Sequence, residues 1–403
     1  MFVLPQTGQG CVIEVNGEDW KFDPFGQLLD RPDPDAYDPC WCGSGQKFRF
    51  CHRDRHRQPR LTNAEFLRGW EDSDDLELCL HPTAPTGCSE GIIKAHTVQR
   101  MGGGLKAIAR DGYVYAYGRH PSFFQKNDLR IVKPELIGTR KASTFRGFCA
   151  AHDAALFRAA EDRPFQPTQE QLYLLNFRAV ASRLHGMDGA VRHSKAMLSY
   201  DRGLPPTLQR QWFAVHHRYV VNHTESLTNL MLLKAEYDRQ LGSRTFDQTN
   251  AFVVRFDGQP DFQCAEIVAL TFDFRGRRLE EPLPPAHLCA YSLAVSGGWV
   301  FVLSWVGRNV AVEQLCASFL ETSDSDKGPA ILRYALEHTD DIFFAPRWWD
   351  SLSSAHQLAT AKALTEPLHP HYLRDPHVLL TKVVPPLTAR YRGARRIGPW
   401  SDA

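Results

Sequence analysis

The chain has 403 residues, with 47 lysine and arginine residues against 46 aspartate and glutamate residues, and its formal net charge is +1. This length corresponds to about two to three domains and is sufficient to bury a core. The chain is 43% hydrophobic and 23% charged, close to globular averages, which excludes a largely disordered protein. No stretch approaches the roughly 18 uninterrupted apolar residues of a membrane span. The balanced charge excludes a uniformly polybasic chain but leaves room for local basic patches.

The ten cysteines are expected to be reduced. The first twenty residues lack the basic segment, apolar core and cleavage site of a secretory signal, so we expect a cytoplasmic protein. Clustered cysteines in that compartment bind metals or react as thiols rather than form disulfides. Cys264, Cys289 and Cys316 lie in or beside apolar runs and are expected in the core.

Residues 1–38 are predicted to form a short hairpin followed by a linker. Apolar and polar residues alternate near Val12, aromatic residues follow, and residues 30–38 are rich in proline and aspartate.

Residues 39–61 contain a compact cysteine pattern, in which Cys40 and Cys42 are followed after eight residues by Cys51 and His52. Three thiolates and one imidazole complete the tetrahedral coordination of a structural zinc ion, and His56 is an alternative fourth ligand. The Gly-Ser-Gly sequence at 43–45 lets the backbone turn back toward the metal. A segment this short has little core, so zinc would supply most of its folding free energy.

This pattern resembles the SEC-C motif, a short zinc-binding module first defined at the C-terminus of a protein-translocation ATPase. The shared features are Cys-x-Cys-Gly-Ser-Gly, a basic and aromatic stretch, and a final Cys-His pair. The resemblance implies the four ligands named above and a basic face that docks onto protein partners or onto membrane or ribosome surfaces. The residues expected to form this face are Lys47, Arg49, Arg53, Arg55 and Arg57.

Residues 62–165 begin with a predicted helix, for which Thr62 is the N-cap, and then contain a second Cys/His set. Cys149 and His152 have the C-x-x-H spacing that places two ligands in the first turn of a helix, and Cys79 and Cys88 lie in a loop rich in proline and glycine. Together the four residues predict a treble-clef-like zinc site. The gap between Cys79 and Cys88 is longer than in a tight zinc knuckle, so Cys79 matches the pattern least well.

The order of knuckle, strand, glycine-rich loop, strand, knuckle and helix also resembles the His-Me finger (HNH) nucleases. The resemblance implies His96 as a general base that activates water, Asn127 as the middle residue and Asp153 as a ligand of a catalytic divalent metal such as Mg²⁺. Ala95 and Asp153 both depart from the family pattern, in which an acid or histidine commonly precedes the catalytic histidine and another histidine ends the motif. The alternative is a purely structural finger, in which His96 is a further zinc ligand or a core histidine.

The same region is locally basic and contains interleaved aromatic residues. The aromatic side chains either stack on nucleic-acid bases or form the small core of the finger. The residues concerned are Lys94, Arg100, Lys106, Arg110, Arg119, Lys126, Arg130, Lys133, Arg140, Lys141 and Arg146, with Tyr113, Tyr115, Tyr117, Phe123 and Phe124.

Residues 166–245 are predicted to form a helical hairpin, because apolar residues recur at helical spacing on both sides of a Pro-Pro break at 205–206. Its second helix carries His216, His217 and His223, which can meet His185 or His193 across the hairpin. No E-x-x-H spacing is present, so we interpret these histidines as packing residues rather than metal ligands.

Residues 246–403 are predicted to form an α+β domain. Apolar runs at 251–256, 265–274, 288–296 and 299–306 indicate strands, and a Ser-Gly-Gly turn at 296–298 joins the last two as a hairpin. Helical patterns at 311–321, 328–338 and 350–366 are expected to cover this sheet.

The sequence therefore predicts a multidomain α+β protein with two N-terminal zinc fingers, a helical hairpin and a C-terminal antiparallel sheet with helices. We interpret it as a recognition protein that binds one or two structural zinc ions and docks a macromolecule, with nucleic acid favoured over protein. The alternatives are an HNH-like nuclease that requires Mg²⁺ or another divalent metal, and a zinc-dependent protein–protein scaffold. No phosphate-binding loop, dinucleotide-binding glycine motif or serine-hydrolase motif is present.

Overall fold

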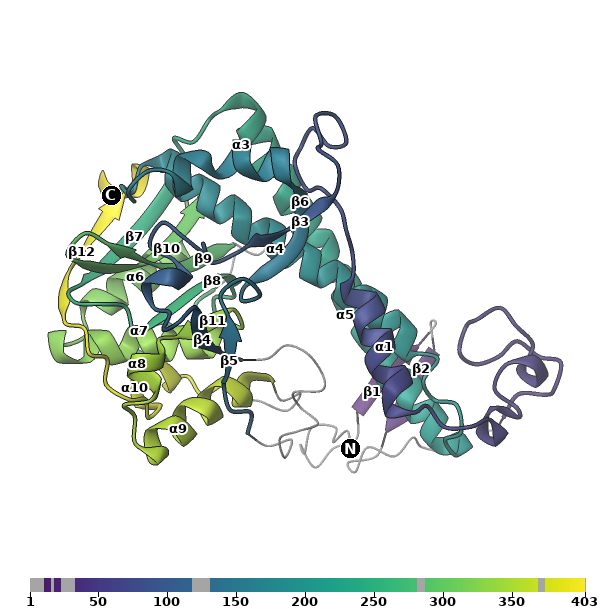
Figure 1. Ribbon diagram of the computed structural model, residues 1–403. Helices are drawn as coiled ribbons and strands as arrows, with labels where there is room; N and C mark the ends of the chain where they lie inside the picture. Colours follow the sequence, from purple (N-terminus) through teal and green to yellow (C-terminus); the bar gives the residue numbers. More distant parts are fainter. Residues whose placement is uncertain are drawn as a thin grey trace. The chain divides into compact units, whose positions relative to one another are not determined.

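The computed structural model describes residues 11–15, 18–22, 33–117, 131–280, 287–368 and 374–402 (Figure 1). The chain forms two compact units. The first comprises residues 1–76 and 186–229, and the second comprises residues 77–185 and 230–403. Among the described helices, none has the length and apolar character needed to cross a membrane.

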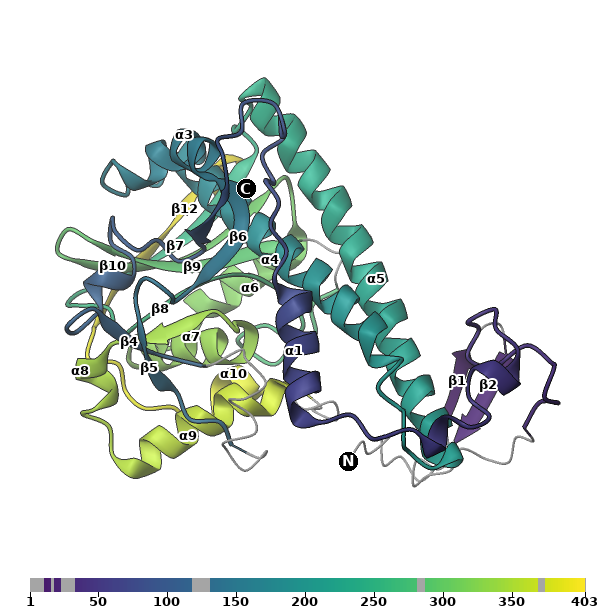
Figure 2. The ribbon, with the colours of Figure 1, turned by 45° about the vertical axis from the view of Figure 1, so that its right-hand side comes forward.

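The first unit contains a hairpin, a short helix and parts of the two long helices. Strands β1 (Cys11–Val15) and β2 (Glu18–Phe22) pair in antiparallel fashion, as Figure 2 shows. Helix α1 (Asn63–Asp74) begins with a capping box, in which the Thr62 side chain accepts a hydrogen bond from the Glu65 backbone and Glu65 accepts one from the Thr62 backbone. The predicted N-cap is therefore confirmed.

The predicted helical hairpin corresponds to α4 (Gln169–Met197) and α5 (Pro206–Ser243). Within the first unit, His193 packs edge-on against Trp70 with ring centroids 4.5 Å apart. The Ser194 hydroxyl lies 2.7 Å from Nδ1 of His223. Among the described residues, the helical histidines belong to no group of three or more possible metal ligands, so the interpretation of these histidines as packing residues is retained.

The second unit is built on an eight-stranded sheet in the order β12-β7-β10-β9-β8-β11-β4-β5, and all of its neighbouring strands are antiparallel. Strands β7 to β10 are almost entirely buried, which agrees with their continuous apolar sequences. The strands are β4 (Tyr113–Ala116), β5 (Glu135–Gly138), β7 (Thr249–Phe256), β8 (Phe262–Val268), β9 (Leu288–Val295), β10 (Gly298–Val306), β11 (Ile342–Phe344) and β12 (Tyr391–Ile397).

Helices accompany this sheet and share its core (Figure 1). Trp299 and Trp305 on β10 are fully buried, as is Trp348 on α8. Cys264, Cys289 and Cys316 are also buried, as expected from their apolar surroundings. The helices are α6 (Val310–Leu320), α7 (Asp324–His338), α8 (Pro346–Trp349), α9 (Ser354–Thr365) and α10 (Val378–Thr381).

A smaller substructure of the second unit carries the other Cys/His residues. Strands β3 (Ile92–His96) and β6 (Thr144–Cys149) form an antiparallel pair, and α3 (Ala150–Glu161) follows directly. Strands β4 and β5, which lie between β3 and β6 in sequence, pair instead into the large sheet through β11. The expected α+β class is confirmed, with a C-terminal antiparallel sheet, helices and N-terminal Cys/His clusters. The finer division into segments 1–38, 39–61, 62–165, 166–245 and 246–403 stays a prediction.

Candidate metal centres

Two groups of cysteine and histidine side chains bring four possible ligand atoms together, each within 4.8 Å of the others. We call Cys40, Cys42, Cys51 and His52 the first cluster, and Cys79, Cys88, Cys149 and His152 the second cluster. All eight residues are those that the sequence proposes as zinc ligands. The alternatives His56 and His96 belong to neither group.

The first cluster has the dimensions of a tetrahedral metal site. Metal distances of about 2.3 Å to sulfur and about 2.0 Å to nitrogen imply ligand separations of roughly 3.5–3.8 Å. The Cys42 and Cys51 sulfurs lie 3.5 Å apart, and Nδ1 of His52 lies 3.2 Å from the sulfurs of Cys40 and of Cys51. The structure therefore places all four donors around one point where zinc fits.

Local backbone geometry builds this cluster. Gly43 and Gly45 have φ values of 70° and 74°, which favour glycine and turn the chain between the two cysteine pairs. The Cys40 amide donates to the Gln46 carbonyl at 2.8 Å, and Phe48 is buried beneath the turn. These contacts explain why the Gly-Ser-Gly sequence lies between the ligands.

A carboxylate far along the chain orients the imidazole of the first cluster. Nε2 of His52 lies 2.8 Å from Asp201, which is fully buried and also accepts a hydrogen bond from Arg55 at 2.6 Å. A histidine that binds metal through one nitrogen commonly donates its other N–H to a carboxylate, which fixes the ring and raises its basicity. Sequence analysis missed Asp201 because 149 residues separate it from His52.

The second cluster has the same composition and the same dimensions. Nδ1 of His152 lies 3.4 Å from the sulfur of Cys79, 3.5 Å from that of Cys88 and 3.4 Å from that of Cys149. These separations match those expected around a tetrahedral zinc ion. The structure thus places Cys79 with the other three donors, despite the long gap that separates it from Cys88.

Comparison with known families agrees with the first cluster. Residues 38–54 match the family of the SEC-C motif. The chain carries a SEC-C finger. No curated protein and no solved structure matches the chain. The motif and the two clusters together support a zinc-binding protein, and the resemblance to HNH nucleases is not shown by these comparisons.

Contacts among the donors of the SEC-C finger shift their pKa values in opposite directions. Contacts with Cys42 and Cys51 raise the pKa of Cys40, whereas contacts with Cys40 and Cys51 lower the pKa of Cys42. Burial acts to lower the pKa of His52, but the hydrogen bond to Asp201 and the contacts with Cys42 and Cys51 outweigh it and raise this pKa to about 11. These directions favour a thiolate at Cys42 and a protonated imidazole at His52 in the absence of metal, and a bound zinc ion would displace the proton of the imidazole nitrogen that binds it.

The second cluster is positioned by a strand pair and a helix end. Ile92 on β3 pairs with Cys149 at the end of β6, and Cys149 is also the N-cap of α3. Burial acts to raise the pKa of Cys149, but hydrogen bonds from His152 and Ser89 outweigh it and lower this pKa to about 6. Burial raises the pKa of Cys88 to about 11. Cys149 is therefore the thiol of this pair that deprotonates first, as expected beside a helix N-terminus.

Residues of the loop between Cys79 and Cys88 enclose the His152 ring. His81 stacks on it with ring centroids 4.0 Å apart, and the Thr83 hydroxyl lies 3.4 Å from its Nε2. Gly87 has a φ of 77°, and a Cβ at this position would lie 3.2 Å from Nε2 of His152. The loop between Cys79 and Cys88 therefore surrounds the His152 ring, which explains why the two cysteines are widely spaced.

Two of the three residues proposed for nuclease chemistry, His96 and Asp153, are described, and neither belongs to a group of three or more possible metal ligands among the described residues. Nε2 of His96 lies 2.9 Å from the Thr139 carbonyl, and burial lowers the pKa of His96. Asp153 lies on α3, where burial raises its pKa. Asn127 lies outside the described residues.

Four of the five cations proposed for docking are exposed on the SEC-C finger, namely Lys47, Arg49, Arg53 and Arg57. Arg55 is different. It is half-buried, and it donates to Asp201 and to the Ser199 carbonyl, each at 2.6 Å. Arg55 therefore holds the carboxylate that orients His52.

Proposed function

We propose that this protein is a zinc-stabilised recognition protein that docks onto nucleic acid through its basic zinc modules. The proposal is supported first by the surface of the SEC-C finger, on which Lys47, Arg49, Arg53 and Arg57 are exposed. Only Asp54 supplies a negative charge between residues 47 and 57, and it pairs with Arg57 at 3.2 Å. Phosphate groups are the natural counter-charge for such a surface.

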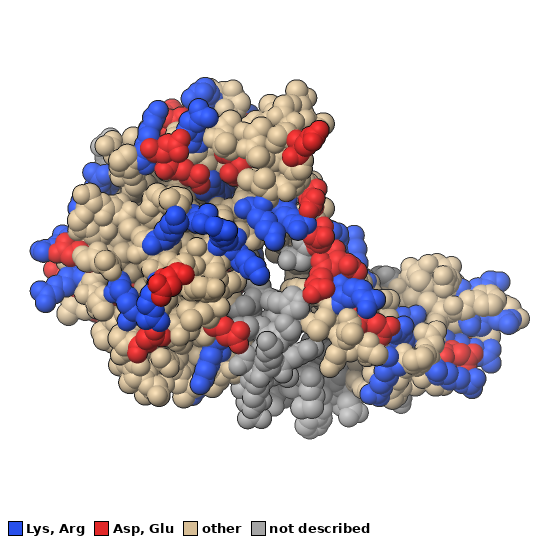
Figure 3. All heavy atoms as spheres, viewed as in Figure 1, with Lys and Arg blue, Asp and Glu red and all other residues tan. Residues whose placement is uncertain are grey.

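Exposed aromatic rings beside these cations favour nucleic acid over protein as the partner of the finger. Phe50 is 68% exposed and Tyr37 is 61% exposed, and the Arg49 guanidinium lies 4.8 Å from the centre of each ring. Bases stack on exposed aromatic rings and on arginine, while the neighbouring cations bind the backbone. Figure 3 shows that basic side chains outnumber acidic ones over this segment, which is the purple finger of Figure 1.

The test is binding of fluorescent single-stranded and double-stranded DNA and RNA by the zinc-loaded protein at about 50 and 200 mM salt. We expect affinity to fall steeply with salt, and K47E/R53E to weaken binding tenfold or more and to reduce the salt slope by about two. The matched control is R68E/K195E, which reverses two exposed charges of the first unit outside the finger. Arg55 is left unchanged because its substitution would disturb Asp201.

Two results would contradict this proposal. Binding that does not depend on salt and survives K47E/R53E would exclude docking through the finger charges. Failure to bind any of the four nucleic acids, together with capture of protein partners that resists nuclease treatment, would support the zinc-dependent scaffold instead. The proposal also requires a reducing compartment such as the cytoplasm, in which the thiols remain available to zinc.

Metal-dependent cleavage of nucleic acid is a second candidate, and it is favoured by the hydrogen bond of His96. The Thr139 carbonyl can only accept, so Nε2 of His96 carries the proton and Nδ1 keeps a lone pair. With its pKa lowered by burial, His96 is neutral at pH 7 and has the form that a general base requires. Asp153 is the companion residue for a divalent metal such as Mg²⁺.

Cleavage assays with Mg²⁺ or Mn²⁺ separate this candidate from docking alone. H96A should abolish cleavage while zinc content and melting temperature stay at wild-type values. Absence of cleavage by the wild-type protein across single-stranded and double-stranded substrates would exclude the nuclease.

A further inference from the structure

A basic pocket in the second unit lies within the stretch of chain between the two halves of the second cluster. It has a volume of about 760 Å³, within the range of ligand-binding pockets. Four cations line it, namely Arg100, Lys106, Arg140 and Lys141, and the described residues contribute no carboxylate to its lining. A pocket with this lining attracts an anion.

Backbone hydrogen bonds hold the segments that carry these cations. Lys106 lies in a 3₁₀ turn (Leu105–Ala107), and its amide donates to the Arg100 carbonyl at 3.0 Å. Arg140 and Lys141 lie in the turn after β5, where the Lys141 amide donates to Gly138 at 2.8 Å. The amide of Thr139, which precedes them, donates to Gly112 at 2.8 Å. A site with a fixed backbone loses little conformational entropy when a ligand binds.

Charge pairing distinguishes the pocket from neighbouring arginines of the same unit. Arg110 pairs with Asp350 at 2.5 Å, and Arg146 forms an ion pair with Glu77. By contrast, none of the four pocket cations forms an ion pair with a carboxylate in the described part of the chain. A bound anion would therefore supply the counter-charge that the described carboxylates do not.

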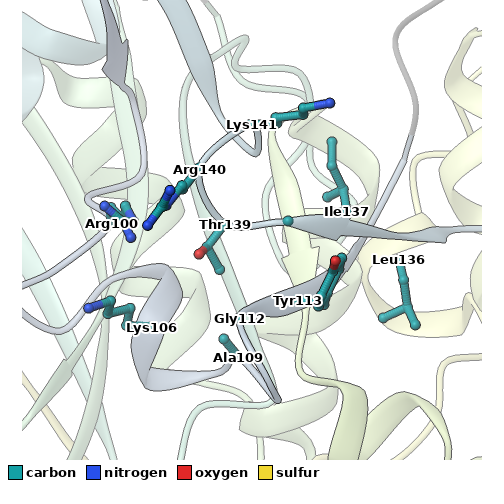
Figure 4. Close-up of a pocket in the computed structure, with 11 residues that line it drawn as sticks. Arg100, Lys106, Ala109, Gly112, Tyr113, Leu136, Ile137, Thr139, Arg140 and Lys141 are labelled. Carbon is teal, nitrogen blue, oxygen red and sulfur yellow. The ribbon is translucent and has the colours of Figure 1, made fainter.

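The other side of the pocket is aromatic and apolar. Figure 4 shows Arg100, Lys106 and Arg140 on one side, and Tyr113 with Leu136 on the other. Tyr113 is 51% exposed and Leu136 is 49% exposed, whereas Val114 between them in the sheet is fully buried. A phosphate group needs only the cationic side, but a nucleotide with an unpaired base uses both.

From this arrangement we infer that the pocket binds the backbone of single-stranded nucleic acid, with phosphates at Arg100, Lys106 and Arg140 and a base stacked on Tyr113. This inference rests on the proposed function and gives it a second, separate binding site. The same pocket lies beside His96, because the Thr139 carbonyl that accepts from His96 belongs to a lining residue. A strand bound there would pass near that imidazole.

The test uses the full-length, zinc-loaded protein and labelled single-stranded DNA and RNA oligonucleotides, each with a duplex of equal length for comparison. We expect K106E/R140E to weaken single-strand binding tenfold or more and to reduce the salt slope by about two. We expect Y113A to weaken it about tenfold with little change in salt slope, because stacking is not a charge interaction.

The matched control is R158E/R163E, which reverses two exposed charges of the same unit outside the pocket and should bind like the wild type. Zinc content and melting temperature report whether each variant folds. Y113A also serves as a variant that leaves the charge of the pocket intact, so a loss of binding cannot come from a change in net charge.

The outcomes separate this inference from the proposed function. Loss of binding in K47E/R53E with wild-type binding in K106E/R140E and Y113A would overturn the pocket and leave docking through the finger in place. The opposite pattern would support the pocket and exclude the finger. Wild-type affinity of Y113A, or equal affinity for duplex and single strand, would overturn the single-strand assignment, and absence of any nucleic-acid binding would overturn both proposals.

Discussion

The two Cys/His clusters offer a metal the same donors, three sulfurs and one Nδ1, but they are assembled from very different lengths of chain. The first cluster takes its ligands from residues 40–52, whereas the second takes them from residues 79–152. Turns around Gly43 and Gly45 suffice to close the first. The second requires the pairing of β3 with β6 and the start of α3.

The residues that orient the histidines show the opposite pattern: they are distant in sequence for the first cluster and close to the ligands for the second. His52, in the local cluster, is oriented by the distant Asp201. His152, in the dispersed cluster, is enclosed by the loop that carries Cys79 and Cys88, through His81 and Gly87. In the first cluster the group that orients the histidine therefore comes from a distant part of the sequence, whereas in the second cluster it lies between two of the ligands.

Removal of one thiol from each cluster is expected to give the largest effect. C51S and C149S should each lower the zinc content from two ions per chain to one, as measured by elemental analysis. C149S should also destabilise the second unit by several kcal/mol, because Cys149 is fully buried where β6 meets α3. C51S should destabilise the finger and leave the melting temperature of the second unit unchanged. Equal losses of stability in the two variants would contradict this difference.

Substitution of the distant carboxylate tests the first cluster alone. D201N keeps the shape of the side chain but removes the charge that accepts from His52 and Arg55. We expect the zinc affinity of the first cluster to fall roughly 10- to 100-fold, with no change at the second. Competition with a chromogenic chelator resolves the two sites. A uniform decrease at both sites would show that Asp201 acts on overall stability rather than on His52.

His216 extends the comparison to a buried histidine outside both clusters. Burial, and to a smaller extent His193, lower its pKa from 6.5 to about 4. Between these pH values the unfolded chain binds a proton that the folded chain excludes, so stability should fall as the pH drops, by up to about 1.4 kcal/mol per pH unit. H216Q should flatten this dependence in urea unfolding between pH 6.5 and 4. If the free energies of unfolding of H216Q and the wild type changed in parallel with pH, at equal zinc content, His216 would not be the source of this pH dependence.

Two glycine substitutions give the smallest expected effects. Gly45 and Gly87 have similar φ values, 74° and 77°, but a Cβ at Gly45 meets nothing within 4 Å. G45A should therefore cost about 1 kcal/mol from backbone strain alone. G87A should cost the same and also weaken zinc at the second cluster, because its Cβ lies 3.2 Å from His152. Equal zinc affinities in the two variants would remove the role of Gly87 in positioning the ring.

The secondary structure was predictable wherever one local signal dominated. The capping box at Thr62 and Glu65, the Pro-Pro break before α5 and the apolar runs of β7, β9 and β10 all have the expected structures. The expected strand at 265–274 was placed less well. Strand β8 occupies Phe262–Val268, since its register is set by β9 and β11 rather than by its own sequence.

The sequence by itself determined the donors of both clusters, because ligand chemistry limits them to cysteine and histidine and the spacing of each half is local. It also determined the helices and most strands through hydrophobic periodicity. Only the tertiary structure decided that Cys79 joins Cys149, that Asp201 orients His52, and that β4 and β5 enter the large sheet and line a basic pocket. These contacts join residues far apart in sequence, and their partners are selected by packing and charge in three dimensions, which local patterns do not encode.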